Sequence, residues 1–289
     1  MNPSAQKFIY CDNESEITVH AAALIIAGAY HAVARHNRCS VALAGGNSPR
    51  PLYTKLAEGV SSAILDHYGL SVPEGLTKKR EELYKLPHNT CFFMSDERYV
   101  PLNHPDSNYR MITETLLPSS GISEKHFFRM ATEPADTEEA AREYETVMRD
   151  FFITAKPLGT FPVFDFIVLG LGEDGHTASL FADTIEALLE KKRWVLAVYV
   201  PQAKPPGMRL TLTLPVINHA RNVLFFTPGT TKSKLSEKIF LEQEKNVPAS
   251  LVKPENGRVF WFTSRSSPPI PALVNEPHRS QAVDLRHPT

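Results

Sequence analysis

The chain has 289 residues, of which 42% are hydrophobic and 22% charged, a composition typical of a folded globular protein with a sizeable core. Its formal net charge of -1 provides no basic field that would gather nucleic acid or an anionic membrane. We therefore expect neither as a partner, and any anion must be bound by local groups.

The cysteines, Cys11, Cys39 and Cys91, are widely spaced and contain no CxxC pair. This argues against a zinc site and a disulfide framework, so we expect reduced, mostly buried thiols. The N-terminal residues lack the basic start and apolar run of a secretory signal, and no uninterrupted apolar segment approaches membrane-spanning length. The expected location is the cytoplasm.

Apolar runs alternate with helix-like segments from the start of the chain. Residues 7–11 (KFIYC) predict a strand, and residues 15–37 have apolar residues at helical spacing, with Ser15 as the cap. SVALAGG (40–46) predicts a second strand, and PRPLYTKLAE (49–58) has the early proline of a helix start. The first quarter therefore reads as strand, helix, strand, helix.

The polar stretch at 66–88 reads as a helical surface excursion rather than as a linker between domains. TCFFM (90–94) predicts the next strand, and helices are predicted over 108–117 and 137–155, the latter with acidic residues in its first turn. FDFIVLG (164–170) then runs as a strand into a glycine-rich loop.

Three more apolar runs follow, at 194–200, 222–229 and 258–264, and we expect them in a sheet covered on both faces. We expect one domain over residues 1–265, followed by a flexible tail at 266–289, which is rich in proline and has no periodicity.

Strands that alternate with helices predict an α/β fold with right-handed crossovers and a parallel, doubly wound sheet. Ligands of such sheets bind beyond the carboxyl ends of the strands. Four segments with reactive or anion-binding side chains directly follow predicted strands: Gly45–Pro49, Ser95–Arg98, Gly170–His176 and Gly229–Lys232.

The loop GLGEDGHTASLF has glycines 170, 172 and 175 at the spacing of a dinucleotide-binding turn. The next predicted strand ends in PQAK, without the carboxylate that would hold a ribose, and Glu173 and Asp174 would repel a pyrophosphate. We therefore expect no nucleotide cofactor.

His176 is the candidate catalyst of this loop. A lone histidine after a glycine turn is more often a cap or a surface residue. Here it opens a predicted helix at a strand end, Asp174 precedes it by two residues, and glycines such as Gly172 admit a ligand close to the backbone. There is no HExxH motif and no second histidine at ligand spacing, so we expect no metal.

Anion-binding groups follow other predicted strands. The turn AGGNSP offers free backbone amides at Gly45, Gly46 and Asn47 and the hydroxyl of Ser48. By itself this pattern is as often an ordinary tight turn as a phosphate site.

Two cations add to this signal. Arg209 precedes the alternating stretch LTLTL, and a guanidinium can bind a phosphate through two hydrogen bonds, although alone it reads as a surface cation. Lys232 lies in the first turn of a predicted helix capped by Thr230 or Thr231, where it opposes the helix dipole unless an anion is bound nearby. Together with the turn at Ser48, these residues predict an anion site at one edge of the sheet.

ALAGGNSP, SDERYVPLNHPDSNYRM, GLGEDGHTASLF, RLTLTLPVIN and PGTTK, in this order, resemble the 6-phosphogluconolactonase family over nearly all of residues 7–264. The resemblance implies a Rossmann-like three-layer α/β/α sandwich with a mostly parallel sheet. It also implies that the enzyme hydrolyses 6-phosphoglucono-δ-lactone in the pentose phosphate pathway, with this phosphorylated sugar lactone as its only partner. No apolar surface pattern demands a second subunit, so we expect a monomer.

The related glucosamine-6-phosphate deaminases share these motifs and are the main alternative. Their loop resembles DGHIAFNEP, with a glutamate five residues after the histidine, whereas this chain has Phe181, which cannot carry a proton. Arg98 also stands where deaminases have tyrosine, and Ala182 stands where lactonases commonly have proline. A second alternative, a non-catalytic sugar-phosphate-binding module, is disfavoured because His176 and Asp174 are both retained.

The resemblance suggests roles for the reacting groups. His176 would take a proton from the water that attacks C1 and return one to the ring oxygen, with Asp174 orienting the imidazole. Arg98, or backbone amides at the predicted helix start, would stabilise the oxyanion.

The remaining residues would bind the substrate. Ser48, Arg209 and Lys232, with the glycine turn before Ser48, would hold the phosphate, which fixes the lactone carbonyl over the histidine. Asp96 would bind sugar hydroxyls or cap the following turn.

Overall fold

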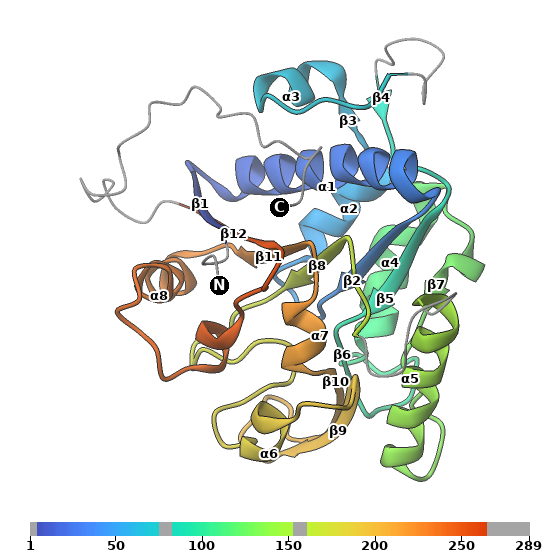
Figure 1. The fold of residues 1–289 in the computed structure, drawn as a ribbon, viewed down its shortest axis with the longest axis vertical. Coiled ribbons are helices and arrows are strands. Elements are labelled where there is room, and N and C mark those ends of the chain that lie inside the picture. Colours follow the sequence, from blue (N-terminus) through green and yellow to red (C-terminus); the bar gives the residue numbers. More distant parts are fainter. Residues whose placement is uncertain (1–4, 75–82, 153–160, 265–289) are drawn as a thin grey trace.

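A computed structural model describes residues 5–74, 83–152 and 161–264 (Figure 1). At its centre is a sheet of seven parallel strands in the order β1-β12-β11-β8-β2-β5-β7. The strands are β1 (Ala5–Cys11), β2 (Cys39–Leu43), β5 (Thr90–Met94), β7 (Phe127–Phe128), β8 (Phe166–Leu169), β11 (Asn222–Thr227) and β12 (Arg258–Ser264). The central strands β2, β5 and β8 are buried along their whole length, which explains their continuous apolar runs. The predicted α/β class and parallel sheet are confirmed.

Helices cover both faces of this sheet and make the predicted three layers (Figure 1). On one face, α1 (Glu14–His36) packs against α2 (Arg50–Glu58), and α2 packs against α4 (Asn108–Ser120). On the other face lie α5 (Thr137–Phe152), α7 (Leu214–Asn218) and α8 (Thr230–Phe240). Right-handed crossovers that run in opposite directions along a sheet place their helices on opposite faces, which accounts for the two layers.

Helix α1 differs from its prediction in two respects. Asn13 caps it by accepting a hydrogen bond from the Glu16 amide, so Ser15 lies inside the helix. By length and composition α1 is apolar enough to cross a membrane, contrary to the expectation that no segment is. Most of its apolar residues are buried inside the fold, so this hydrophobicity serves the core. The three cysteines are free and buried, as predicted.

A second sheet lies apart from the central one (Figure 1). It contains three antiparallel strands in the order β6 (Asp96–Arg98), β10 (Gly207–Leu212) and β9 (Val195–Val200). The apolar run at 194–200 was expected in the central sheet, and that expectation is wrong. Tyr199 on β9 is 61% exposed, as one face of an antiparallel sheet can be. The short helix α6 (Ile185–Leu189) precedes this strand.

The prediction of a helical excursion at 66–88 is also wrong for the residues of that stretch that the structure describes, 66–74 and 83–88. The helix there, α3 (Ser62–His67), ends where the excursion was to begin, and the short strands β3 (Val60–Ser61) and β4 (Leu83–Tyr84) pair antiparallel. The Tyr68 ring stacks on His20 of α1 at 3.8 Å, which ties this segment to the core.

Several predicted regions fall outside the described residues. They are 75–82 of the excursion, 153–155 of the helix predicted over 137–155, and the tail at 266–289. Two 3₁₀ turns complete the described fold, η1 (Glu124–His126) and η2 (Pro248–Leu251).

Candidate active site

The four segments that follow predicted strands meet at one edge of the central sheet. They come directly after β11, β8, β2 and β5, which are consecutive in the sheet. From β2 the chain moves outward to β5, and from β8 it moves the opposite way to β11, so the connections diverge between β2 and β8. Doubly wound sheets bind their ligands outside the carboxyl ends of the strands at such a divergence. The site is therefore centred on the loops after β2 and β8.

The loop after β8 is a succession of turns, with no helix before α6. The Gly172 amide donates to the His176 carbonyl at 2.9 Å, and the Gly175 amide donates to the Gly172 carbonyl at 3.0 Å. A Cβ atom on Gly172 would lie 2.1 Å from Nδ1 of His176, so the imidazole requires a glycine there. The prediction that His176 begins a helix is wrong, because these turn hydrogen bonds use the backbone groups that a helix would need. The suggestion that amides at a helix start hold the oxyanion fails with it.

His176 and Asp174 form the predicted pair. Nδ1 of the imidazole lies 2.5 Å from Oδ1 of Asp174, which also accepts the His176 backbone amide at 3.2 Å. Within the described residues Nε2 has no hydrogen-bond partner. The Phe181 ring stacks on the imidazole with centroids 4.0 Å apart and planes at 20°. One face of the imidazole is thus covered by an apolar ring, one nitrogen is held by a carboxylate, and the other nitrogen is free to meet a ligand.

Ser48 and Lys232, 184 residues apart in sequence, are in direct contact. The Lys232 ammonium donates to the Ser48 hydroxyl at 2.9 Å, which bridges the segments after β11 and β2. Burial lowers the pKa of Lys232, and nearby Glu173 opposes this shift. Gly229, with φ 95°, is the N-cap of α8, so Thr230 and Thr231 lie inside the helix and not at the predicted cap position. A half-buried ammonium against a hydroxyl, at a helix start, is suited to an anion.

The glycine turn after β2 lies beside this contact. Gly46 has φ 86°, a left-handed conformation that favours glycine. A Cβ atom on Gly45 would overlap the Asn108 side chain, so α4 abuts the turn directly. Asn47 is exposed at its tip, and its carbonyl accepts the Arg50 amide at 3.3 Å. The turn is therefore placed by close packing against α4.

Arg209, which was predicted at the phosphate site, lies in the second sheet. It lies on β10 opposite Arg98 of β6, and its guanidinium donates to the Pro205 carbonyl at 2.7 Å. The residue is 4% exposed, and burial lowers its pKa, which nearby Asp96 opposes. No described contact joins it to Ser48 or Lys232. Because β10 pairs with β6 in the second sheet, Arg209 is grouped with Arg98 and Asp96 instead.

Two functional candidates escaped the sequence analysis. Glu97 is 1% exposed, and its carboxylate accepts the backbone amides of Arg98, Asn108 and Tyr109. Burial raises its pKa to about 7, although these hydrogen bonds act in the opposite direction. Ser179, fully buried, donates to Asp96. The position of Glu97 between Asp96 and Arg98 was a visible signal, whereas nothing in the sequence marked Ser179.

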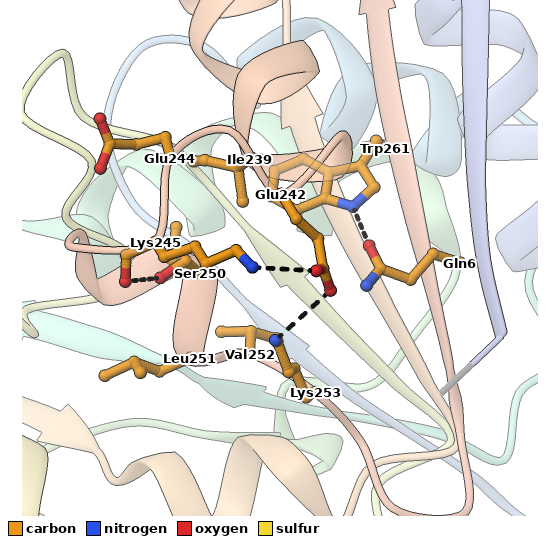
Figure 2. A pocket seen from close by; sticks show the side chains of 11 residues that line it. Gln6, Ile239, Glu242, Glu244, Lys245, Ser250, Leu251, Val252, Lys253 and Trp261 are labelled. Carbon is orange, nitrogen blue, oxygen red and sulfur yellow. Dashed lines mark hydrogen bonds and ion pairs between the residues drawn. The ribbon is translucent and has the colours of Figure 1, made fainter. Parts of the chain in front are cut away.

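Two surface cavities lie near these elements, and His176 lines neither. One, of about 300 Å³, is lined by Glu173 and by Thr231, Lys234, Leu235 and Lys238 of α8, which places the histidine loop beside that helix. The other cavity, of about 190 Å³, is lined by Trp261 and Gln6, and the indole N–H of Trp261 donates to the Gln6 side chain at 3.1 Å (Figure 2). Its wall includes Ala249, whose amide donates to the Gly175 carbonyl at 3.0 Å.

The chain is similar to known proteins over most of its length. A family model described as glucosamine-6-phosphate isomerases/6-phosphogluconolactonase matches residues 12–261. The 6-phosphogluconolactonase of Synechocystis sp. is 36% identical over 239 residues, which cover 82% of this chain and 86% of that protein. The Homo sapiens 6-phosphogluconolactonase is 38% identical over 184 residues, 63% of this chain and 69% of its own length.

Solved structures show the same likeness. The 6-phosphogluconolactonase of Thermotoga maritima superposes with a TM-score of 0.68 at 26% identity, covering 90% of this chain and 99% of that one. The enzyme of the same name from Trypanosoma cruzi gives a TM-score of 0.70 at 29% identity, covering 91% and 97%.

Proposed function

Because the chain belongs to the glucosamine-6-phosphate isomerase/6-phosphogluconolactonase family, we propose that the loops after β2 and β8 form the active site of a 6-phosphogluconolactonase. The chain is a lactone hydrolase, and its substrate is 6-phosphoglucono-δ-lactone, which it converts to 6-phosphogluconate in the pentose phosphate pathway. The observation that carries the proposal is the pairing of His176 with Asp174 on the loop after β8, the strand that lies between those that lead to Ser48 and Lys232.

His176 acts as the general base. Asp174 accepts a hydrogen bond from the protonated Nδ1 of the neutral imidazole. The other ring nitrogen, Nε2, therefore carries the free lone pair. Nε2 takes a proton from water as the water oxygen bonds to C1 of the lactone. The bond between C1 and the ring oxygen then breaks, and the imidazolium returns the proton to that oxygen. Between these two steps Asp174 stabilises the positively charged imidazolium. General acid–base catalysis of this kind contributes roughly 10²–10⁴-fold to the rate of a reaction.

The phosphate end is held by Ser48, Lys232 and the amides of the glycine turn. Glu173 is near the Lys232 ammonium, but within the described residues no acidic group is hydrogen-bonded to it, so a phosphate would supply a charged hydrogen-bond partner. Holding the distal phosphate fixes the lactone carbonyl near the imidazole, which lowers the entropic cost of reaching the transition state.

Arg98 is the proposed oxyanion group. The proposal is supported by the link of its strand β6 to the histidine loop through Asp96 and Ser179, and the Arg98 guanidinium donates to the Asp106 carbonyl at 2.8 Å. Arg209, buried directly opposite Arg98 on the neighbouring strand, adds positive charge beside it rather than a direct contact with phosphate. We also propose that the protein is a cytoplasmic monomer.

Phe181 favours the lactonase over the deaminase. The deaminase motif has a glutamate at this position to assist ring opening by the histidine. Here the position holds a phenyl ring stacked 4.0 Å from the imidazole, which covers the ring without exchanging protons. Ester hydrolysis needs no second proton carrier at this face.

The test is a coupled assay of 6-phosphoglucono-δ-lactone against the unphosphorylated lactone, with spontaneous hydrolysis subtracted from both. We expect the phosphorylated lactone to be favoured by about 100-fold in kcat/KM, because hydrogen bonds to charged groups are lost without the phosphate. Ammonia release from glucosamine 6-phosphate would establish the deaminase instead. Calorimetric binding of 6-phosphogluconate without lactone turnover would establish a binding module.

A further inference from the structure

Ser179 joins the histidine loop to the small antiparallel sheet. Its hydroxyl donates to Oδ2 of Asp96 at 2.8 Å, and its amide donates to the Thr211 hydroxyl at 3.2 Å. Asp96 and Thr211 are directly opposite each other in the pairing of β6 with β10. Ser179 therefore docks on one cross-strand pair, and all three residues are buried.

The turn that delivers Ser179 has an unfavourable backbone conformation. Ala178 has φ 47°, a left-handed region that alanine rarely adopts, and it follows His176 by only two residues. Such a conformation persists where surrounding contacts impose it. The contacts are the Thr177 hydroxyl, which donates to the Gly170 carbonyl at 2.9 Å, and the two hydrogen bonds of Ser179.

Asp96 is occupied by the protein itself. Its Oδ2 accepts from Ser179 and its Oδ1 from the Ser95 hydroxyl at 3.3 Å, and the residue is 6% exposed. Each oxygen thus accepts one hydrogen bond from the protein, and near-complete burial leaves little of this carboxylate open to sugar hydroxyls. The expectation that Asp96 contacts substrate therefore gives way to a different role.

We infer that Ser179 and Asp96 are a positioning pair that fixes His176 relative to Arg98, an inference that rests on the proposed function. Arg98 lies two residues from Asp96 on the rigid strand β6, and His176 lies three residues from Ser179 on a loop of turns. The Ser179–Asp96 hydrogen bond sets the distance between the base and the cation. Neither residue of the pair touches the substrate.

The test is Ser179→Ala, with Ser40→Ala as its matched control. Ser40 is also a buried serine that donates to an aspartate, Asp165 at 3.0 Å, but it lies at the opposite end of the sheet. We expect both variants to lose thermal stability, and only Ser179→Ala to lose kcat, on the order of 100-fold. Its KM and its calorimetric affinity for 6-phosphogluconate should stay within about twofold, as expected when only the reacting groups are misaligned.

Equal kcat in the two variants would overturn the inference, as would a loss of product affinity without a loss of kcat in Ser179→Ala. If Ser179→Ala does not fold, Asp96→Ala provides the same test, because it removes the acceptor of the same hydrogen bond. Where both variants fold, Asp96→Ala should lower kcat in the wild-type background and add nothing to Ser179→Ala. Additive losses would mean that Asp96 acts on substrate directly. Absence of lactone turnover in the wild-type chain would refute the proposed function itself, so the two failures are distinguishable.

Discussion

Strand β8 has an aspartate–histidine pair at each end, and we propose a catalytic role for only one of the two. At the amino end, Asp165 lies 3.2 Å from Nε2 of His36, and at the carboxyl end Asp174 lies 2.5 Å from Nδ1 of His176. The two histidine side chains are equally exposed, at 34% and 32%. The exposure of the histidine therefore does not separate the pairs.

The aspartates separate them. The Asp165 side chain is 4% exposed, accepts the Ser40 amide and hydroxyl at 2.9 and 3.0 Å, and has Arg221 at 3.7 Å. Its charge is used to join β2 to β8. The Asp174 side chain is 56% exposed, and its described hydrogen bonds go only to His176. An aspartate–histidine pair becomes a catalytic candidate where the carboxylate is hydrogen-bonded only to the histidine and where neighbouring glycines leave room for a ligand.

The largest expected effect is on turnover when the histidine is removed. His176→Ala should lower kcat by about 10²–10⁴-fold, because the proton acceptor is lost, with little change in KM. His36→Ala should leave kcat unchanged and lower only the melting temperature. Both are measured by lactone hydrolysis with the spontaneous rate subtracted. Normal turnover in His176→Ala would remove the distinction between the two ends of β8.

The aspartates should differ in the same way with a smaller effect on kcat. Asp174→Asn should reduce kcat by about 10–100-fold, because the imidazolium and its tautomer lose their carboxylate in an exposed site. Asp165→Asn should leave kcat within twofold and lower the free energy of unfolding by about 1–3 kcal/mol, since a buried acceptor of several hydrogen bonds is altered. Urea unfolding and initial rates of the two variants decide the matter. A loss of kcat in Asp165→Asn together with an unchanged kcat in Asp174→Asn would contradict this prediction.

The smallest expected effect on kcat comes from Lys232→Met. Removal of this ammonium should raise KM for the phosphorylated lactone by about 10–100-fold, because a charged hydrogen bond is lost, and leave hydrolysis of the unphosphorylated lactone unchanged. Lys245→Met, in an exposed ion pair with Glu242, is the control and should change neither. Equal losses on both lactones would show that Lys232 does not bind the phosphate.

Much of the site followed from local sequence. Asp174 and His176 are two residues apart and follow a buried strand, so their pairing depended on few intervening torsions. Ser48 and Lys232 were predicted together because both follow strands of a parallel sheet, whose carboxyl ends share an edge. The pairing of Arg209 with Arg98 was not predicted, because an alternating strand reveals which face is buried and not which strand it will pair with.

The sequence by itself determined the alternation of strands and helices, the parallel central sheet and the edge at which reactive side chains gather. These features can be predicted locally, because the spacing of apolar residues distinguishes strands from helices and the glycines mark the turns that follow the strands. The tertiary structure alone decided that 195–200 belongs to a second sheet, that Arg209 lies against Arg98, and that Ser179 reaches Asp96. Those outcomes depend on which surfaces meet, and a buried residue looks the same in sequence whichever neighbour covers it.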